Sequence, residues 1–178
     1  DPLPSQVETW LIEPLKAPEF SLPDLAGNLL ELKSLHGGYV LVHFWTTTTP
    51  FCVEQLKLLH RNWSALSANH LEILAVNVDN PGDVSRARSF ATQERFSFPV
   101  LFATEEVAGI YNLLYRHLFD RRRDLAIPTS LLLDREGMIV KVYQGALDPG
   151  RLLVDVKSVP TTSGARLLKA LPFSGMLV

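Results

Sequence analysis

The sequence is poor in cysteine, in net charge and in long apolar runs. Its only cysteine is Cys52, so no internal disulfide can form, and cysteine content does not indicate a redox compartment. A net charge of −2 excludes a general electrostatic attraction to nucleic acid or to an anionic membrane. The densest apolar run, Tyr39–Trp45, is too short to cross a bilayer, and no signal-peptide pattern is present. What remains is the class of globular proteins, and 178 residues suffice for one domain with a sizeable core.

Patterns typical of metal and phosphate sites are also missing. Cys52, His60 and His70 lie on or near one predicted helix but lack a ligand spacing such as i, i+4. Gly37-Gly38 does not form a phosphate-binding loop, and no nucleophile-elbow pattern occurs. We therefore expect no metal and no cofactor.

The elements that the sequence does predict alternate between strand and helix. Two short strands flank the turn Ala26-Gly27-Asn28. Apolar runs and helical periodicity then predict, in order, a buried strand 39–45, a helix 50–69, a strand 71–79, a helix 83–93, an extended segment 96–103, a helix 105–119, strands 129–134 and 138–145, and helices 148–158 and 163–171. Alternation predicts an α/β fold, and the closing hairpin makes part of the sheet antiparallel.

Three segments organise the chain. Residues 1–16 hold Pro2, Pro4 and Pro14 and predict an irregular lead-in. Residues 17–158 are the folded domain, and residues 159–178 form a tail or a linker helix that leads to another domain. Because the chain begins with aspartate rather than methionine, we expect an excised domain or a processed protein.

The single cysteine lies in the stretch HFWTTTTPFCVEQL, residues 43–56, where a strand runs into a helix. Thr49 is a good N-cap, because its hydroxyl can accept a hydrogen bond from a backbone N–H two or three residues later. Pro50 suits the first helical position, whose N–H has no partner in any helix. Cys52 then lies in the first turn, where the helix dipole favours a thiolate. The alternative is that Cys52 is a small buried apolar residue beneath the helix.

The order of these motifs resembles a known family. The stretch APEFSLPDLAGNLLELKSLHGGYVLVHFWTTTTPFCVEQL is similar to the start of a thioredoxin-fold redoxin domain, and AVNVD, FSFPVLFA and AIPTSLLLDREGMIVKVYQG continue the likeness over roughly residues 17–157. The nearest group is the TlpA-like thiol–disulfide oxidoreductases, within the alkyl-hydroperoxide-reductase/thiol-specific-antioxidant (AhpC/TSA) superfamily. The resemblance implies a thioredoxin-like fold with a mixed central sheet flanked by helices and an N-terminal strand extension.

The same resemblance implies a degenerate active site. Trp45 and Pro50 keep their places in the family pattern, Cys52 falls on its second cysteine, and Thr49 replaces the first. The first cysteine of such a motif attacks the substrate disulfide, and the second resolves the mixed disulfide. A chain that keeps only the resolving cysteine is not expected to reduce disulfides by itself.

Another branch of the superfamily offers an alternative. Peroxiredoxins carry Thr-x-x-Cys, which Thr49–Cys52 matches, and their cysteine attacks peroxide. Their pattern also has a proline where this chain has Trp45, and an arginine where it has Pro128. A weak peroxidase resting on Cys52 and Thr49 therefore stays an open hypothesis.

Ile127-Pro128 resembles the cis-proline signature of the thioredoxin fold, in which the preceding residue pairs with an extended substrate. The resemblance thus implies a substrate-binding set of Trp45, Pro50, Phe51, Ile127 and Pro128. Arg121, Arg122 and Arg123 precede this loop and are candidates for a cation near the site; the alternative is a solvated charged loop.

Three hypotheses for function follow. An exposed, reactive Cys52 would indicate a lone-thiol oxidoreductase. A buried Cys52 beside an open apolar groove would indicate a non-catalytic module that binds a peptide or a partner domain at Trp45, Thr49 and Ile127-Pro128. A buried cysteine without a groove would indicate a structural domain. We expect as partner a protein or peptide thiol or disulfide, or another domain of the parent chain, with neither nucleic acid nor a transmembrane segment. The resemblance favours an extracytoplasmic location.

Overall fold

The structure is a computed structural model that describes residues 6–119 and 127–171. A six-stranded sheet has the order β1-β8-β7-β4-β5-β6. The strands are β1 (Gln6–Lys16), β4 (Tyr39–Trp45), β5 (Leu71–Asn77), β6 (Val100–Phe102), β7 (Thr129–Leu133) and β8 (Met138–Gly145). β4, β5 and β6 are parallel, whereas β7 and β8 join them through antiparallel pairings. The expected mixed sheet and thioredoxin-like architecture are confirmed.

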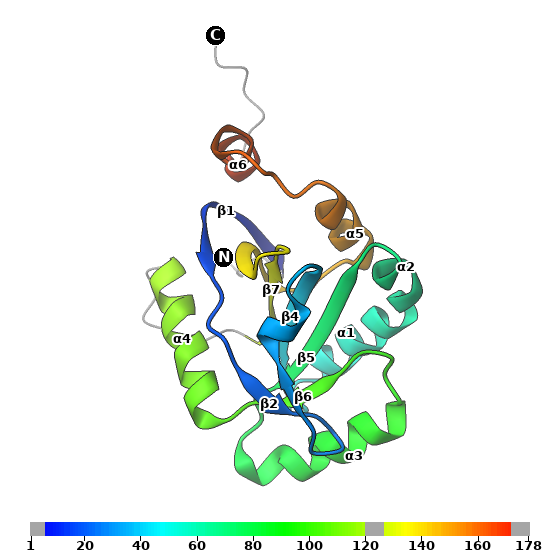
Figure 1. Ribbon diagram of the computed structural model, residues 1–178. Coiled ribbons are helices and arrows are strands. Elements are labelled where there is room, and N and C mark those ends of the chain that lie inside the picture. The colour runs from blue at the N-terminus through cyan, green and yellow to red at the C-terminus, as the bar shows by residue number, and fades with distance from the viewer. Residues whose placement is uncertain (1–5, 120–126, 172–178) are drawn as a thin grey trace, which may run out of the picture.

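Helices cover both faces of this sheet (Figure 1). The helices are α1 (Pro50–Arg61), α2 (Trp63–Ser67), α3 (Val84–Glu94), α4 (Glu105–Phe119), α5 (Pro149–Lys157) and α6 (Ser163–Ala170). One core cluster joins the sheet to α1, α3 and α5 through Leu56, Ala87 and Leu152. The second lies under α4, represented by Tyr111, and under the small hairpin represented by Leu22. None of the helices in the described ranges has the length and apolar character needed to cross a membrane.

The hairpin that precedes strand β4 matches the sequence prediction of two short strands around a turn. β2 (Ser21–Pro23) and β3 (Leu29–Glu31) pair antiparallel, as the N-terminal strand extension requires, and the 3-10 helix η1 (Leu32–Leu35) follows. Gly27 has a φ of 86°, which a turn residue without Cβ adopts without strain. A second 3-10 helix, η2 (Pro81–Asp83), connects β5 to α3.

The prediction of an irregular lead-in over residues 1–16 is wrong for residues 6–16. These form β1, an eleven-residue strand that pairs antiparallel with β8. The pairing register shifts between Trp10 and Leu15, so Pro14 falls in the irregular part, where no ladder bond is required of it. The proline that indicated irregular structure is therefore compatible with an edge strand.

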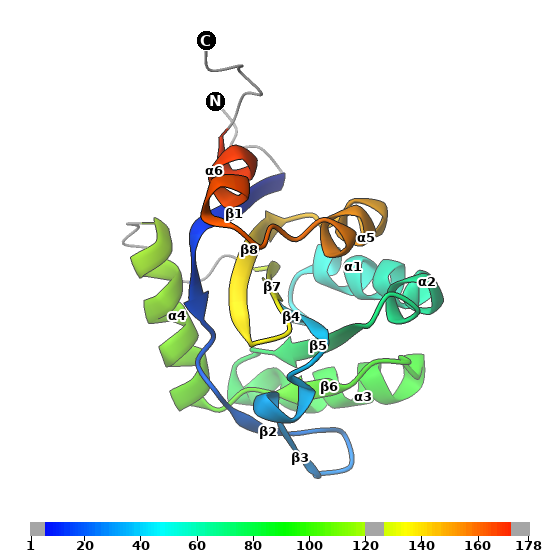
Figure 2. The same cartoon turned by 45° about the horizontal axis from the view of Figure 1, so that its top comes forward.

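The last helix lies against that strand. Figure 2 shows that α6, which follows α5 in the chain, lies beside β1. The Nε of Arg166 donates to the carbonyl oxygen of Ile12 at 3.2 Å, and the ammonium group of Lys169 lies 4.3 Å from the ring centre of Trp10. The segment after α5 thus packs onto the N-terminal strand; whether it also leads to another domain stays a prediction.

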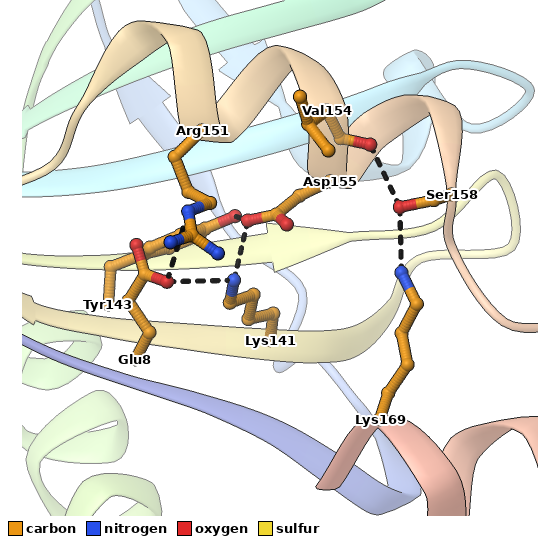
Figure 3. Close-up of polar contacts among 8 residues, drawn as sticks. All are labelled: Glu8, Lys141, Tyr143, Arg151, Val154, Asp155, Ser158 and Lys169. Carbon is orange, nitrogen blue, oxygen red and sulfur yellow. Dashed lines mark hydrogen bonds and ion pairs between the residues drawn. The ribbon is translucent and has the colours of Figure 1, made fainter. Parts of the chain in front are cut away.

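A buried ionic cluster fastens β1 to β8 and α5 (Figure 3). The ammonium group of Lys141, whose side chain is 2% exposed, lies 2.5 Å from Asp155 and 3.2 Å from Glu8. The hydroxyl of Tyr143 donates to the same Asp155 carboxylate at 2.6 Å. We call Glu8, Lys141, Tyr143 and Asp155 the Lys141 cluster. In this cluster two carboxylates pair with one buried cation. Such pairing is needed because an unpaired buried charge is costly.

Candidate functional site around Cys52

The candidate site begins where β4 ends, in the loop Thr46–Thr49, which we call the threonine loop. Thr49 occupies the N-cap position of α1 with an extended backbone, and the N–H of Cys52 donates to its carbonyl oxygen at 2.9 Å. Its hydroxyl, however, makes no capping bond to the helix. The prediction that the Thr49 hydroxyl accepts a hydrogen bond from the helix is therefore wrong. That hydroxyl oxygen instead accepts a hydrogen bond from the Thr46 hydroxyl at 3.4 Å.

Cys52 lies under this loop and is fully buried, at 0% exposure. Burial raises the pKa of its thiol, and the nearby carboxylate of Asp79 raises it further. Hydrogen bonding by Thr46 and Thr49 lowers the pKa, but this effect is smaller than that of burial. The balance keeps the thiol protonated, although Cys52 lies in the first turn of a helix, where the dipole favours a thiolate.

Asp79, just after β5, holds the threonine loop in place. Its carboxylate accepts hydrogen bonds from the Thr47 backbone N–H at 3.1 and 3.0 Å, from the Thr47 hydroxyl at 2.8 Å and from the Asn77 side-chain amide at 2.9 Å. The sequence analysis missed this residue. The available signal was the register, because β4 and β5 are parallel and their carboxyl ends meet at one edge of the sheet.

The loop before β7 faces the same end of the sheet. The peptide bond from Ile127 to Pro128 is cis, and the Gly145 N–H donates to the Pro128 carbonyl at 2.9 Å. Among the hydrogen bonds of the described residues, none involves the backbone of Ile127. That backbone is free to pair with a ligand.

The five predicted substrate-binding residues do not share one exposure. Trp45 and Pro128 are buried, so their side chains contribute no accessible surface. Pro50 is exposed, Ile127 is half-buried, and Phe51 is 45% exposed, an unusual degree for an aromatic side chain. The predicted set thus divides into two buried and three accessible residues.

Two adjoining cavities open beside the threonine loop, on the α4 side of the sheet. The first, about 280 Å³, is lined by Thr46 and Ile127 together with Phe44 and Tyr111. The second, about 430 Å³, extends toward Asp79 and the start of α4. Both are lined by Val78, Asn80 and Ala108. We call the two cavities the groove. Sequence reasoning missed the α4 residues of the groove, because the packing of α4 against the sheet brings them to it.

His43 lies beneath the site in β4, where it is fully buried. Its Nδ1 lies 2.7 Å from the Ser130 hydroxyl oxygen, whereas its Nε2 has no partner among the described residues. Burial lowers the pKa of His43 from 6.5 to about 4, so the ring is neutral near pH 7. The indole nitrogen of Trp45, two residues further on the same face, is likewise buried without a partner.

Charged groups near the site differ from the peroxiredoxin pattern. In the described part of the chain, the charged group that acts on the pKa of Cys52 is the carboxylate of Asp79, which opposes a thiolate. The candidate cations Arg121, Arg122 and Arg123 lie outside the described residues. No cluster of histidine, cysteine, aspartate or glutamate suited to a metal ion occurs within residues 6–119 and 127–171.

The comparisons with known proteins agree with this geometry. A thiol–disulfide oxidoreductase, ResA, from Halalkalibacterium halodurans is 28% identical over 132 residues, which cover 74% of this chain and 68% of that protein. The crystal structure of a thiol:disulfide interchange protein from Chlorobium tepidum matches with a TM-score of 0.69 at 21% identity, covering 83% of this chain and 97% of that one. A secreted disulfide oxidoreductase from Mycobacterium tuberculosis matches at 0.59 and 20% identity, covering 78% and 94%. The sequence profile of the AhpC/TSA family matches residues 15–142. The chain belongs to the AhpC/TSA family of thioredoxin-like proteins, with one cysteine at the position of the redox motif.

Proposed function

We propose that this domain is a thioredoxin-like binding module with a degenerate thiol site. It holds an extended polypeptide segment in the groove between the threonine loop and Ile127, and it does not reduce disulfides by itself. The observation that carries the proposal is the complete burial of Cys52 beside an open groove. A buried, protonated thiol is neither accessible nor nucleophilic, whereas the groove is accessible and has both apolar and polar lining residues.

The lining of the groove suits a polypeptide. Phe44 and Tyr111 give it apolar walls, and Asn80 presents an exposed side chain at its middle. A carboxamide donates and accepts hydrogen bonds, as a peptide group does, so it pairs with extended main chain. The unpaired backbone of Ile127 offers a second pairing point at one end.

Selection from a random decapeptide library displayed on phage tests the proposal. Ala108→Trp fills both cavities, and Leu113→Trp places the same ring on an exposed position of α4 outside the groove. We expect peptides that bind the parent domain and Leu113→Trp but not Ala108→Trp, with equal thermal midpoints for the two variants. Equal binding by all three proteins, or no enriched peptide, would contradict a peptide groove.

Lone-thiol chemistry at Cys52 is the second candidate, because Thr46 and Thr49 hydrogen-bond the sulfur in a way that favours a thiolate. A thiolate that attacks hydrogen peroxide forms a sulfenic acid and releases hydroxide. Mass spectrometry after a peroxide pulse measures this product in the folded and in the urea-unfolded protein. Faster oxidation of the folded protein near pH 7 would favour this candidate over the binding module.

The relatives support a proposal for the partner and the location. We propose a protein or peptide partner, or a neighbouring domain of the parent chain, because related proteins act in thiol:disulfide interchange. An extracytoplasmic location is supported by the secreted oxidoreductase that shares the fold.

A further inference from the structure

The carboxylate of Asp79 accepts hydrogen bonds from both Thr47 and Asn77. This carboxylate is half-buried, and it binds the threonine loop through both the backbone and the hydroxyl of Thr47 while Asn77 steadies it from β5. Hydrogen bonds to a charged acceptor are stronger than those between neutral groups. The loop end of β4 is thus attached to the loop end of β5 by one side chain.

The attached loop leads directly into the first turn of α1, where Cys52 is buried. The Cys52 N–H donates to the Thr49 carbonyl oxygen at 2.9 Å, the Thr46 hydroxyl donates to that of Thr49 at 3.4 Å, and both threonines lower the pKa of the thiol. A loop that left Asp79 would therefore withdraw these contacts from the surroundings of the thiol. The four threonines contribute no large apolar side chain to hold the loop, so the carboxylate is its main tether.

The tether is accessible from the groove. Asp79 lines the second cavity, and Thr46 lines the first. A hydrogen-bond donor in the groove, such as a peptide N–H or a lysine ammonium, would compete with Thr47 for the same carboxylate.

We infer that Asp79 is a latch that holds the threonine loop closed over Cys52, so that loss of the Asp79–Thr47 contact exposes the thiol. Asp79 is a positioning residue, since it acts on the thiol through the loop and through its charge. The inference goes beyond the proposed peptide groove, because it states what controls access to the cysteine and does not depend on a bound peptide.

The rate of Cys52 alkylation by iodoacetamide between pH 6 and pH 10 tests the latch. Asp79→Asn keeps the shape of the side chain but removes its charge, and Thr47→Val removes only the hydroxyl bond. We expect Asp79→Asn to accelerate alkylation of the folded protein about tenfold, since charge-assisted bonds become neutral ones. Because the Asp79 carboxylate raises the pKa of Cys52, its removal also moves the alkylation profile to lower pH. Thr47→Val is expected to accelerate alkylation by a smaller factor without moving the profile.

A matched control separates the latch from general loosening. Asp24→Asn removes the charge of another turn carboxylate, which accepts hydrogen bonds from the N–H groups of Ala26 and Asn28 far from Cys52, and it should leave alkylation unchanged. Equal rates and equal profiles for the parent, Asp79→Asn and Thr47→Val proteins would overturn the inference. If Asp79→Asn did not fold, Thr47→Val alone would decide the matter. Failure of peptide selection would leave this result standing, so the two proposals fail separately.

Discussion

Two regions of the central sheet differ in how they hold charged side chains. At the β1–β8 edge of the sheet, the Lys141 cluster buries a lysine between two carboxylates and joins β1, β8 and α5. At the site, the charged group with an effect on Cys52, within the described residues, is the half-buried Asp79, and it binds a loop of threonines. The charges of the Lys141 cluster are paired and largely buried, whereas the region around Asp79 borders an open groove.

The contrast indicates that the Lys141 cluster contributes to stability, whereas the threonine loop controls access to Cys52. A buried ion pair is costly to break because the remaining partner stays buried and uncompensated. A hydroxyl-rich loop held by one carboxylate costs much less to open. We therefore expect substitutions in the Lys141 cluster to act on unfolding and substitutions at the site to act on access, reactivity and binding.

Lys141→Met should have the largest effect on stability. It removes the cation and leaves the buried carboxylate of Asp155 without its ion-pair partner, whereas Glu8 keeps Arg151 at 3.9 Å. We therefore expect the free energy of unfolding to fall by about 3–5 kcal/mol. Urea denaturation followed by tryptophan fluorescence measures it. Lys57→Met is the control, because Lys57 makes only partly exposed pairs at 3.8 and 3.9 Å and should cost about 1 kcal/mol or less. Equal losses in both variants would remove the distinction between the two kinds of ion pair.

That cluster also shows where sequence reasoning stops. The strand 138–145 is predicted at its observed bounds, yet nothing in its sequence indicates that Lys141 is buried. Its partners are Asp155, from the following helix, and Glu8, which is 133 positions away along the chain. A burial that depends on a partner in β1 cannot be inferred while β1 itself is taken for an irregular segment.

The second largest effect concerns His43 and the pH. The unfolded ring protonates near pH 6.5 and the folded ring near pH 4, so between these values the unfolded chain binds more protons. Stability is therefore complete above pH 6.5 and falls as the pH drops toward 4, by about 3 kcal/mol in total. Denaturation at pH 7 and pH 4.5 measures the loss. His43→Gln should abolish this part of the pH dependence, and an unchanged dependence in that variant would assign it to other groups.

A third change converts the site back to the family pattern. Thr49→Cys restores two cysteines at the motif spacing, and the half-buried position 49 brings the attacking thiol closer to solvent than Cys52. We expect reduction of a small aromatic disulfide to become at least about tenfold faster than with the parent protein. Thr48→Cys is the matched control, because it adds an exposed thiol without the motif spacing. Equal acceleration by both would show that exposure alone, rather than the motif, supplies the activity.

The position of Cys52 just after a strand was predictable from the sequence, but its burial and the residues around it were not. The family resemblance places Cys52 and Ile127-Pro128 at one end of the sheet; in the structure Ile127 lines the groove, whereas Cys52 lines neither cavity. Burial of the thiol and the tether at Asp79 depend on how the threonine loop packs against β5, which local propensity does not encode.

The smallest expected effect compares two helix starts at the same end of the sheet, one after β4 and one after β8. Asp148 caps α5 with a real side-chain bond, since its carboxylate accepts from the Gly150 N–H at 3.2 Å. Thr49 begins α1 without such a bond, because its hydroxyl is engaged by Thr46. We therefore expect Asp148→Ala to cost about 1 kcal/mol of unfolding free energy and Thr49→Ala less than about 0.5 kcal/mol. Paired denaturation curves at pH 7 measure the difference. A larger loss at Thr49 would mean that its hydroxyl supports the helix after all, and the residue that replaces the attacking cysteine would then have a structural reason to be threonine.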